Sequence, residues 1–231
     1  MGTKGKRGGE VAGCGEATPS VRLARAAGTS AVVAALAFAA LLGVRTLQSP
    51  DLGYHLSYGL QGAVDHNAFL FTLPAADTPP EARPAPGPGC WYDQQGRYRF
   101  PNANWLSQVI MARVYRLGAM TALSIFQALM VIAIFIIIMM TMRRNGIDWV
   151  WIALAIMLTS LAGYERFNLR PEVFGYLILA AQWYLLVRLF PAGGPERLSW
   201  WQIASLMLLQ ILAVNLHSYF LLGVAIALAV L

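Results

Sequence analysis

The uncharged stretch AMTALSIFQALMVIAIFIIIMMTM, from Ala119 to Met142, decides the fold class of this chain. An α-helix rises 1.5 Å per residue, so this stretch is long enough to cross the roughly 30 Å hydrocarbon core of a bilayer. Arg143 and Arg144 follow it directly, and basic residues of this kind are typical of the cytoplasmic ends of membrane spans. The stretch therefore predicts a transmembrane helix.

The composition supports a membrane protein and argues against a nucleic-acid-binding one. The 231 residues are 58% hydrophobic and 12% charged, whereas a soluble domain carries about 25% charged residues. The formal net charge is +6. The basic residues lie in short segments beside apolar runs rather than in a stripe interleaved with aromatics, so they indicate membrane topology. We therefore expect membrane lipid as a partner and no nucleic acid.

Apolar runs recur along the chain and predict an all-α polytopic membrane protein. The expected spans are residues 29–47, 119–142, 147–163, 171–189, 200–214 and 219–231. Residues 1–28 are polar, Gly-rich and basic, and predict a disordered cytoplasmic tail before a transmembrane domain at 29–231. A cleaved signal peptide is the alternative interpretation of the first span. Because the chain ends inside an apolar run, we interpret it as the truncated, N-terminal part of a longer protein.

The distribution of Lys and Arg predicts the topology. The basic tail, the turn at Arg143 and the turn that contains Arg188 all belong in the cytoplasm, so the N-terminus is cytoplasmic. The same alternation places residues 48–118, 164–170 and 215–218 on the outer side. All three histidines of the chain therefore face outward.

The outer loop 48–118 predicts two amphipathic juxtamembrane helices. The first covers residues 49–63, with Ser49 as its N-cap and Pro50 as its first helical residue. The second runs from Asn102 to about Leu117. Between them, residues 73–100 are rich in Pro, Gly and Ala and predict a flexible surface insert.

Asp51 and His55 are the first candidate site residues, because helical spacing places them on one face. They could act as a general base and its partner, or bind a cation or phosphate. The simpler alternative is that Asp51 complements the helix dipole, which contributes about 0.3–1 kcal/mol. Asp65 begins a further polar segment, which is either part of the site or an ordinary turn.

Other outer-side residues could complete a site. Arg170 precedes Pro171 at a predicted helix start, where backbone N–H groups and a guanidinium suit a phosphate, and Arg166 is nearby. The alternative is an arginine that reaches lipid headgroups. Asn215 and His217 interrupt an apolar run at a depth where polar backbone lines a cavity or is buried in protein, although an ordinary loop is the alternative.

The order of these motifs resembles bacterial multi-spanning proteins of the GT-C glycosyltransferase superfamily. The matching motifs are Asp51-x-x-x-His55, Gly59, Asp65 with Phe69-x-Phe71-Thr72, Asn104-Trp105-Leu106, Arg170-Pro171 and Asn215-Leu216-His217. The resemblance covers roughly residues 29–231. The chain departs from the family in having no tandem acidic pair after the first span, no Asp-x-Asp and an added Pro-rich insert.

The resemblance implies a GT-C-like helical bundle that transfers a sugar from a polyprenyl-phosphate donor at the outer face of the bacterial inner membrane. By position it matches Asp51 to the family's catalytic acidic residue and makes Arg170 the candidate for the lipid phosphate. Together with the outer-side clustering, this predicts catalysis by Asp51 and His55, and substrate binding by Asp65, Arg166, Arg170, Asn215 and His217. No cofactor is required, although a divalent metal is compatible with the chemistry. The alternatives are a non-catalytic protein that binds a lipid-linked glycan or envelope component, and a transporter fragment. The oligomeric state is left open.

Overall fold

A computed structural model describes residues 18–44, 47, 49–62, 77–190 and 199–230, and these residues form an all-α membrane-type protein. The described residues contain seven α-helices: α1 (Pro19–Gly43), α2 (Leu52–Gln61), α3 (Trp105–Arg144), α4 (Trp149–Ala162), α5 (Pro171–Leu189), α6 (Trp200–Leu216) and α7 (Phe220–Val230). Of these, α1, α3 and α5 are long and apolar enough to cross a membrane, whereas α4, α6 and α7 are shorter apolar helices. The expected all-α membrane architecture is confirmed, and the GT-C-like character of the bundle stays a prediction.

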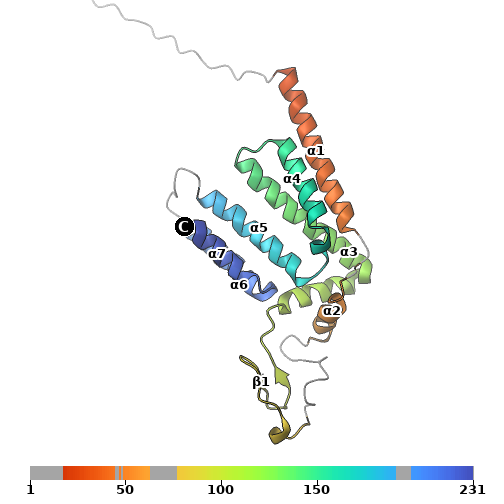
Figure 1. The fold of residues 1–231 in the computed structure, drawn as a ribbon, viewed down its shortest axis with the longest axis vertical. Helices are drawn as coiled ribbons and strands as arrows, with labels where there is room; N and C mark the ends of the chain where they lie inside the picture. Colours follow the sequence, from red (N-terminus) through yellow and green to blue (C-terminus); the bar gives the residue numbers. More distant parts are fainter. Residues whose placement is uncertain (1–17, 45–46, 48, 63–76, 191–198, 231) are drawn as a thin grey trace, which may run out of the picture.

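The helices pack around α3 and α5, which lie next to each other in the bundle (Figure 1). On one side, α1 packs against α3 and α4 and shares with them a core that includes Val131, Phe135 and Ile152. On the other side, α6 and α7 pack against α5. A second core joins α2, α3, α5 and α6 and includes Met111 and Val173. Both cores meet at α3.

Helix α3 contains both the second amphipathic helix and the second span, separated by a kink. Gly118 and Ala119 have non-helical backbone angles, with φ of −175° and 51°. A positive φ at alanine is strained, so packing on both sides must hold the kink. The kink turns the first part of α3 (residues 105–117) across the end of the bundle, while the second part runs through it (Figure 1). The kink falls where the sequence places the end of the juxtamembrane helix and the start of the span.

Helix α2 lies directly on the first part of α3. Gly59 is required for this approach, because a Cβ at that position would overlap the Gln108 carbonyl oxygen and come within 2.9 Å of Ala112 Cβ. Leu52 and Leu56 are buried in the shared core, as their helical spacing predicts. Close backbone contact thus brings the side chains of α2 and α3 together.

Two helix starts differ from what the sequence predicts. Helix α1 begins at Pro19, a residue suited to a first helical turn, so residues 19–28 of the predicted disordered tail are helical. Residues 1–17 of the predicted tail lie outside the described residues. Helix α2 begins at Leu52, with Asp51 at its N-cap position, so Ser49 is not the N-cap. The Ser49 hydroxyl has a different partner, which belongs to the candidate site.

The described part of the Pro-rich insert is not without structure. Residues 77–100 contain a 3₁₀ turn at Pro80–Ala82 and an antiparallel hairpin of β1 (Trp91–Tyr92) and β2 (Tyr98–Arg99). Asp93 closes the hairpin, since its carboxylate accepts from the Arg97 and Arg99 side chains at 2.9 and 2.8 Å. The hairpin projects from the end of the bundle that bears α2 (Figure 1). The sequence predicts a flexible surface insert here, and that prediction did not include the hairpin.

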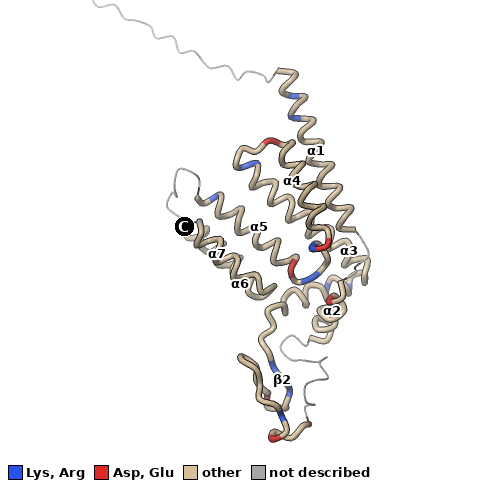
Figure 2. Tube along the Cα trace, in the orientation of Figure 1, with Lys and Arg blue, Asp and Glu red and all other residues tan. Residues whose placement is uncertain are grey.

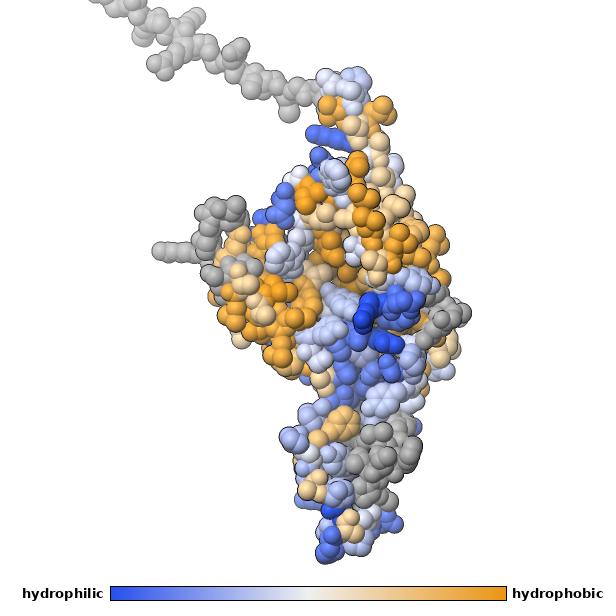
Figure 3. All heavy atoms as spheres, viewed as in Figure 1, coloured by the Kyte–Doolittle hydropathy of each residue, from blue (hydrophilic) through white to orange (hydrophobic). Residues whose placement is uncertain are grey.

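Charged residues collect at the two ends of the bundle and leave its middle apolar (Figure 2). One end, called here the α2 end, bears α2, the 3₁₀ turn η2 (Tyr164–Phe167), the start of α5 and the break between α6 and α7. The opposite end bears the basic α3–α4 turn and the end of α5. Figure 3 shows an apolar bundle surface with hydrophilic side chains gathered near α2. This grouping agrees with the alternation of ends predicted from charge.

Candidate functional site

The α2 end of the bundle brings together side chains from four distant segments. These segments are α2 with the residues before it, the start of α3, the start of α5, and the break after α6. The residues that meet there, directly or through a shared partner, are Ser49, Asp51, His55, Asn102, Asn104, Trp105, Gln108, Arg170, Asn215 and His217. Five of the seven residues singled out from the sequence are among them.

Arg170 joins the start of α5 to the chain before α2. Its Nε donates to Ser49 Oγ at 2.8 Å, and its Nη1 lies 3.6 Å from Asp51 Oδ2. The Arg170 side chain is 29% exposed and the Asp51 side chain 56% exposed, so both remain accessible to a ligand. A guanidinium has five N–H donors, and these two contacts leave others for an anion.

His55 is held by two linked hydrogen bonds through the side-chain amides of Gln108 and Asn102. Its Nδ1 lies 3.1 Å from Gln108 Nε2, and Gln108 Oε1 accepts from Asn102 Nδ2 at 2.8 Å. Gln108 is only 2% exposed, so its amide is fixed within the α2–α3 contact. His55 itself is half-buried beside Tyr54, with the two rings 5.3 Å apart.

The break between α6 and α7 is tied to the start of α3 by two hydrogen bonds. His217 Nδ1 lies 2.9 Å from Asn104 Oδ1. Trp105 Nε1 donates to Asn215 Oδ1 at 2.7 Å. Because an amide oxygen only accepts, His217 carries its proton on Nδ1 in this contact. The motifs Asn104-Trp105 and Asn215-Leu216-His217 are therefore direct partners.

Burial is the main influence on both histidines of the site. It lowers the pKa of His55 to about 4, with Asp51 acting in the opposite direction and His217 and Arg170 adding to the decrease. Burial also lowers the pKa of His217, against the attraction of Glu172 in the first turn of α5. Both imidazoles are therefore neutral at neutral pH. These influences also show that Asp51, His55, Arg170 and His217 share one electrostatic environment.

One buried glutamine fixes the ends of two segments that enter the site. Gln127, in the second part of α3, is 0% exposed. Its Nε2 donates to the Gly43 carbonyl at the end of α1 at 2.9 Å, and its Oε1 accepts from the Leu169 N–H at 2.8 Å. Gly43 lies shortly before Ser49, and Leu169 directly precedes Arg170. Gln127 therefore ties the end of α1 to the residue directly before Arg170.

Two of the predicted site residues are not part of this cluster. Arg166 is exposed in η2, and among the described residues no hydrogen bond or ion pair joins it to Asp51 or Arg170. Asp65 lies outside the described residues, so its expected role stays a prediction. Sequence reasoning missed Ser49 as a ligand of Arg170 and Gln108 as a partner of His55. The spacing of Asn104 and Gln108 on one helix face was the available signal for Gln108.

The donors and acceptors present suit anion binding and proton transfer. Arg170 offers guanidinium N–H groups, Ser49 offers a hydroxyl, and Asp51 is an exposed carboxylate. Within the described segments there is no group of three or more His, Cys, Asp or Glu side chains that could hold a metal ion. Asp51 with His55 is the pair that could contribute ligands to a divalent cation there.

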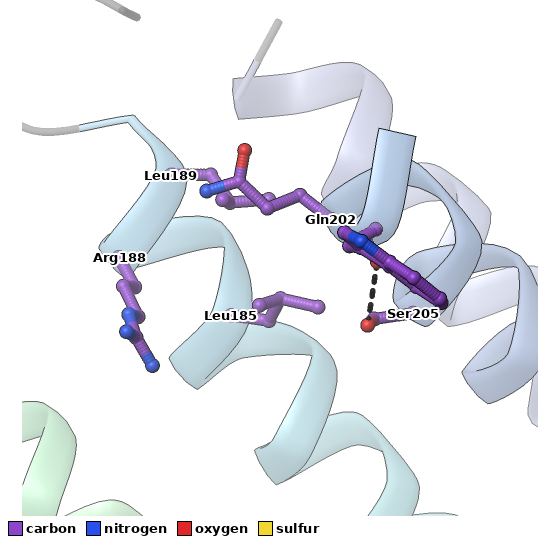
Figure 4. A pocket seen from close by; sticks show the side chains of 6 residues that line it. Leu185, Arg188, Leu189, Gln202 and Ser205 are labelled. Carbon is purple, nitrogen blue, oxygen red and sulfur yellow. Dashed lines mark hydrogen bonds between the residues drawn. The ribbon is translucent and has the colours of Figure 1, made fainter. Parts of the chain in front are cut away.

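A separate cavity lies at the opposite end of the bundle, between α5 and α6 (Figure 4). Its volume is about 190 Å³, and it is lined by Leu185, Arg188, Leu189, Trp201, Gln202 and Ser205. Gln202 and Leu185 extend into the space between the two helices, whereas Ser205 donates to the Trp201 carbonyl. The lining has no carboxylate or imidazole, so it lacks the proton acceptors found at the α2 end. We therefore place the candidate chemistry at the α2 end.

Comparisons with protein-family models, with curated proteins and with solved structures found no match. The class of this protein is therefore defined by its own fold and site. It is an all-α, multi-pass membrane protein with a polar site at one end of an apolar helical bundle. The site is built from the juxtamembrane helix α2, the kinked helix α3 and two helix ends.

Proposed function

We propose that this chain acts as, or forms part of, a membrane glycosyltransferase that moves a sugar from a polyprenyl-phosphate donor to an acceptor at the outer face of a bacterial inner membrane. The observation that carries the proposal is the contact of Arg170 with Asp51 and Ser49. It places an exposed carboxylate, a guanidinium and a hydroxyl at the end of an apolar bundle. The guanidinium and the hydroxyl suit a lipid phosphate, because its chain must lie in the membrane while its charge is paired at the surface, and the carboxylate adds a proton acceptor.

The proposed reaction is a direct displacement that inverts the anomeric carbon. Asp51 takes the proton of the acceptor hydroxyl, and the acceptor oxygen forms a bond to the anomeric carbon. The bond from that carbon to the phosphate oxygen breaks, and the electron pair leaves with the phosphate. Arg170 and the Ser49 hydroxyl stabilise the negative charge that develops on the leaving phosphate. His55 supports Asp51 or contacts the phosphate, and Asn215 and His217, which bond to the start of α3, line the site.

The Asp51–Arg170 pair must open for this reaction. At 3.6 Å and with both side chains partly exposed, the pair contributes little to stability, about 0–1 kcal/mol. A phosphate that binds Arg170 therefore meets a small cost when it displaces Asp51. The released carboxylate is then free to face the acceptor hydroxyl.

A non-catalytic protein that binds a lipid-linked glycan is the second candidate. It is favoured by the same donor set, since Arg170, Ser49 and the neutral His55 can bind a phosphate without any proton leaving Asp51. In that case Asp51 serves only as the ion-pair partner of Arg170 when no phosphate is bound. The two candidates differ only in whether the carboxylate of Asp51 is needed for chemistry.

Substitution of Asp51 by asparagine separates them. The full chain in lipid nanodiscs is assayed for transfer from radiolabelled polyprenyl-phosphate hexose and aminoarabinose donors, and for retention of polyprenyl phosphate. A transferase loses transfer in Asp51→Asn while it keeps folding and lipid retention, and Arg166→Ala serves as the matched outer-side control. If Asp51→Asn changes nothing while Arg170→Ala abolishes lipid retention, the binding protein is correct. If neither substitution alters transfer or retention, the proposed site is wrong.

A further inference from the structure

The orientation of the amides beside His55 can be derived from one backbone group. The Asn104 backbone N–H donates to Asn102 Oδ1 at 3.0 Å. A backbone N–H can only donate, so the oxygen of Asn102 must face it, and the Asn102 NH₂ group must point the other way. The side-chain amide of Asn102 therefore has one allowed orientation.

The orientation of the Asn102 amide fixes the orientation of the Gln108 amide, and through it the position of the proton on the imidazole of His55. Asn102 Nδ2 donates to Gln108 Oε1 at 2.8 Å, so the NH₂ group of Gln108 must lie on the far side of its amide. This NH₂ group is 3.1 Å from His55 Nδ1. Since an NH₂ group donates and has no acceptor function here, His55 Nδ1 must be unprotonated.

We infer that Gln108 is a positioning residue that holds His55 as a neutral imidazole with its proton on Nε2, so that His55 meets an oxyanion as a hydrogen-bond donor and does not act as a base. The identification of this oxyanion as the phosphate of a lipid-linked sugar rests on the proposed function. The tautomer itself does not, because it follows from the hydrogen bonds alone.

Three titratable groups act on His55, and its partner on α3 is the uncharged Gln108. Asp51 lies one turn earlier at the N-cap of α2, Arg170 lies at the N-cap of α5, and His217 follows α6. Asp51 favours a protonated ring, whereas Arg170, His217 and burial disfavour it, and the balance leaves the pKa of His55 at about 4. Electrostatics therefore agrees with the geometry that the ring is neutral at neutral pH, and the hydrogen bonds determine which nitrogen carries the proton.

The inference assigns separate roles to the two neighbouring histidines. His55 carries its proton on Nε2, and His217, which donates from Nδ1 to Asn104 Oδ1, carries its proton on Nδ1. The Nε2 atom of His217 is then an acceptor. The donor group of His55 joins Arg170 and Ser49 as the groups that can hold phosphate oxygens. The site thus combines donors from His55, Arg170 and Ser49 with an acceptor nitrogen of His217.

Nitrogen NMR of ¹⁵N-histidine-labelled full chain in lipid bilayers tests this inference. The chain has three histidines, so single His→Gln substitutions assign each signal. At pH 7 we expect His55 to show a protonated Nε2 and an unprotonated Nδ1. In Gln108→Glu the side chain offers an acceptor instead of a donor, so the proton of His55 should move to Nδ1 or the ring should become doubly protonated. The matched control Gln182→Glu, in a buried glutamine of α5, should leave the His55 signals unchanged.

Two results would overturn the inference. One is a wild-type His55 with its proton on Nδ1 or on both nitrogens at pH 7, a result that needs no variant to fold. The other is a folded Gln108→Glu protein whose His55 signals match the wild type. Addition of polyprenyl phosphate should shift the Nε2–H signal of His55. If the signal does not shift, His55 does not donate a hydrogen bond to the phosphate. A correct tautomer in a protein without sugar transfer would contradict the proposed function alone.

Discussion

Replacement of Gln127 by leucine is expected to destabilise the bundle and to disturb the site at the same time. Gln127 links the Gly43 carbonyl at the end of α1 to the Leu169 N–H directly before Arg170. Leucine has nearly the same volume, so the substitution removes the two hydrogen bonds without opening a large cavity. It leaves the N–H of Leu169, a residue that is 0% exposed, without its partner.

The magnitude follows from the groups left unpaired. A buried donor without a partner costs about 1–3 kcal/mol, and the Gly43 carbonyl, one of the last four of α1, adds roughly another 1 kcal/mol. We therefore expect a loss of about 2–4 kcal/mol in the free energy of unfolding. Arg170 should also lose its fixed position, so polyprenyl phosphate retention should fall with stability.

Equilibrium unfolding in detergent micelles measures this loss, with Gln182→Leu as the matched control. Gln182 is also buried, but its Oε1 has no hydrogen-bond partner among the described residues, and its Nε2 has one contact, to Gln210. Its replacement removes an unpaired polar atom and one hydrogen bond to Gln210, which is only half-buried and keeps its bond to the Phe220 carbonyl, so the change should stay below about 1 kcal/mol. Equal losses in the two variants would refute the argument that the Gln127 bridge, rather than burial of an amide, sets the effect.

Two further substitutions follow from the α2–α3 contact. Gly59→Ala should lower the free energy of unfolding by about 1–3 kcal/mol and loosen His55 from Gln108, because a Cβ there overlaps the Gln108 carbonyl. Gly53→Ala, at an open position of α2, is the control. Equal unfolding midpoints in the two variants would contradict the close approach of α2 to α3. Because of His55, the free energy of unfolding should fall as the pH drops. Above pH 6.5, the ordinary pKa of histidine, His55 is neutral in both the folded and the unfolded protein. Between pH 6.5 and its folded pKa of about 4, His55 gains a proton only in the unfolded chain. Thermal midpoints at pH 7 and 5 should therefore differ less in His55→Gln than in the wild type, and parallel curves would refute this.

The sequence predicted the helical elements well because membrane spans are encoded locally. The span at 171–189 coincides with α5, and the break predicted at 215–218 overlaps residues 217–219, which separate α6 from α7. Length, absence of charge and flanking arginines are properties of one segment at a time. Charge alternation then sorted the loops into two groups, and the structure places Asp51, Arg170 and His217 at one end of the bundle as that sorting predicts.

The contacts within the site could not be predicted in the same way. The Ser49–Arg170 hydrogen bond joins residues 121 positions apart, and the Trp105–Asn215 bond joins residues 110 positions apart. Such pairs depend on how the helices pack. Ser49 illustrates the limit: it has the chemistry of an N-cap, but the turn at residues 50–51 moves the helix start, and its hydroxyl accepts from Arg170 instead. The hairpin at 91–99 was missed because composition outweighed its short turn signal.

Zero-length cross-linking tests most directly whether Asp51 and Arg170 form one site. The chain has only two lysines, Lys4 and Lys6, so Arg170→Lys introduces the single lysine amine of the transmembrane region. A carbodiimide joins a carboxylate to an amine only when the two are in contact, and mass spectrometry of the digested protein locates the bond. We predict a cross-link between Asp51 and the introduced amine in Arg170→Lys, and none to Asp51 in Arg166→Lys. Absence of the first cross-link in a folded protein, or equal cross-linking in both variants, would contradict the site described here.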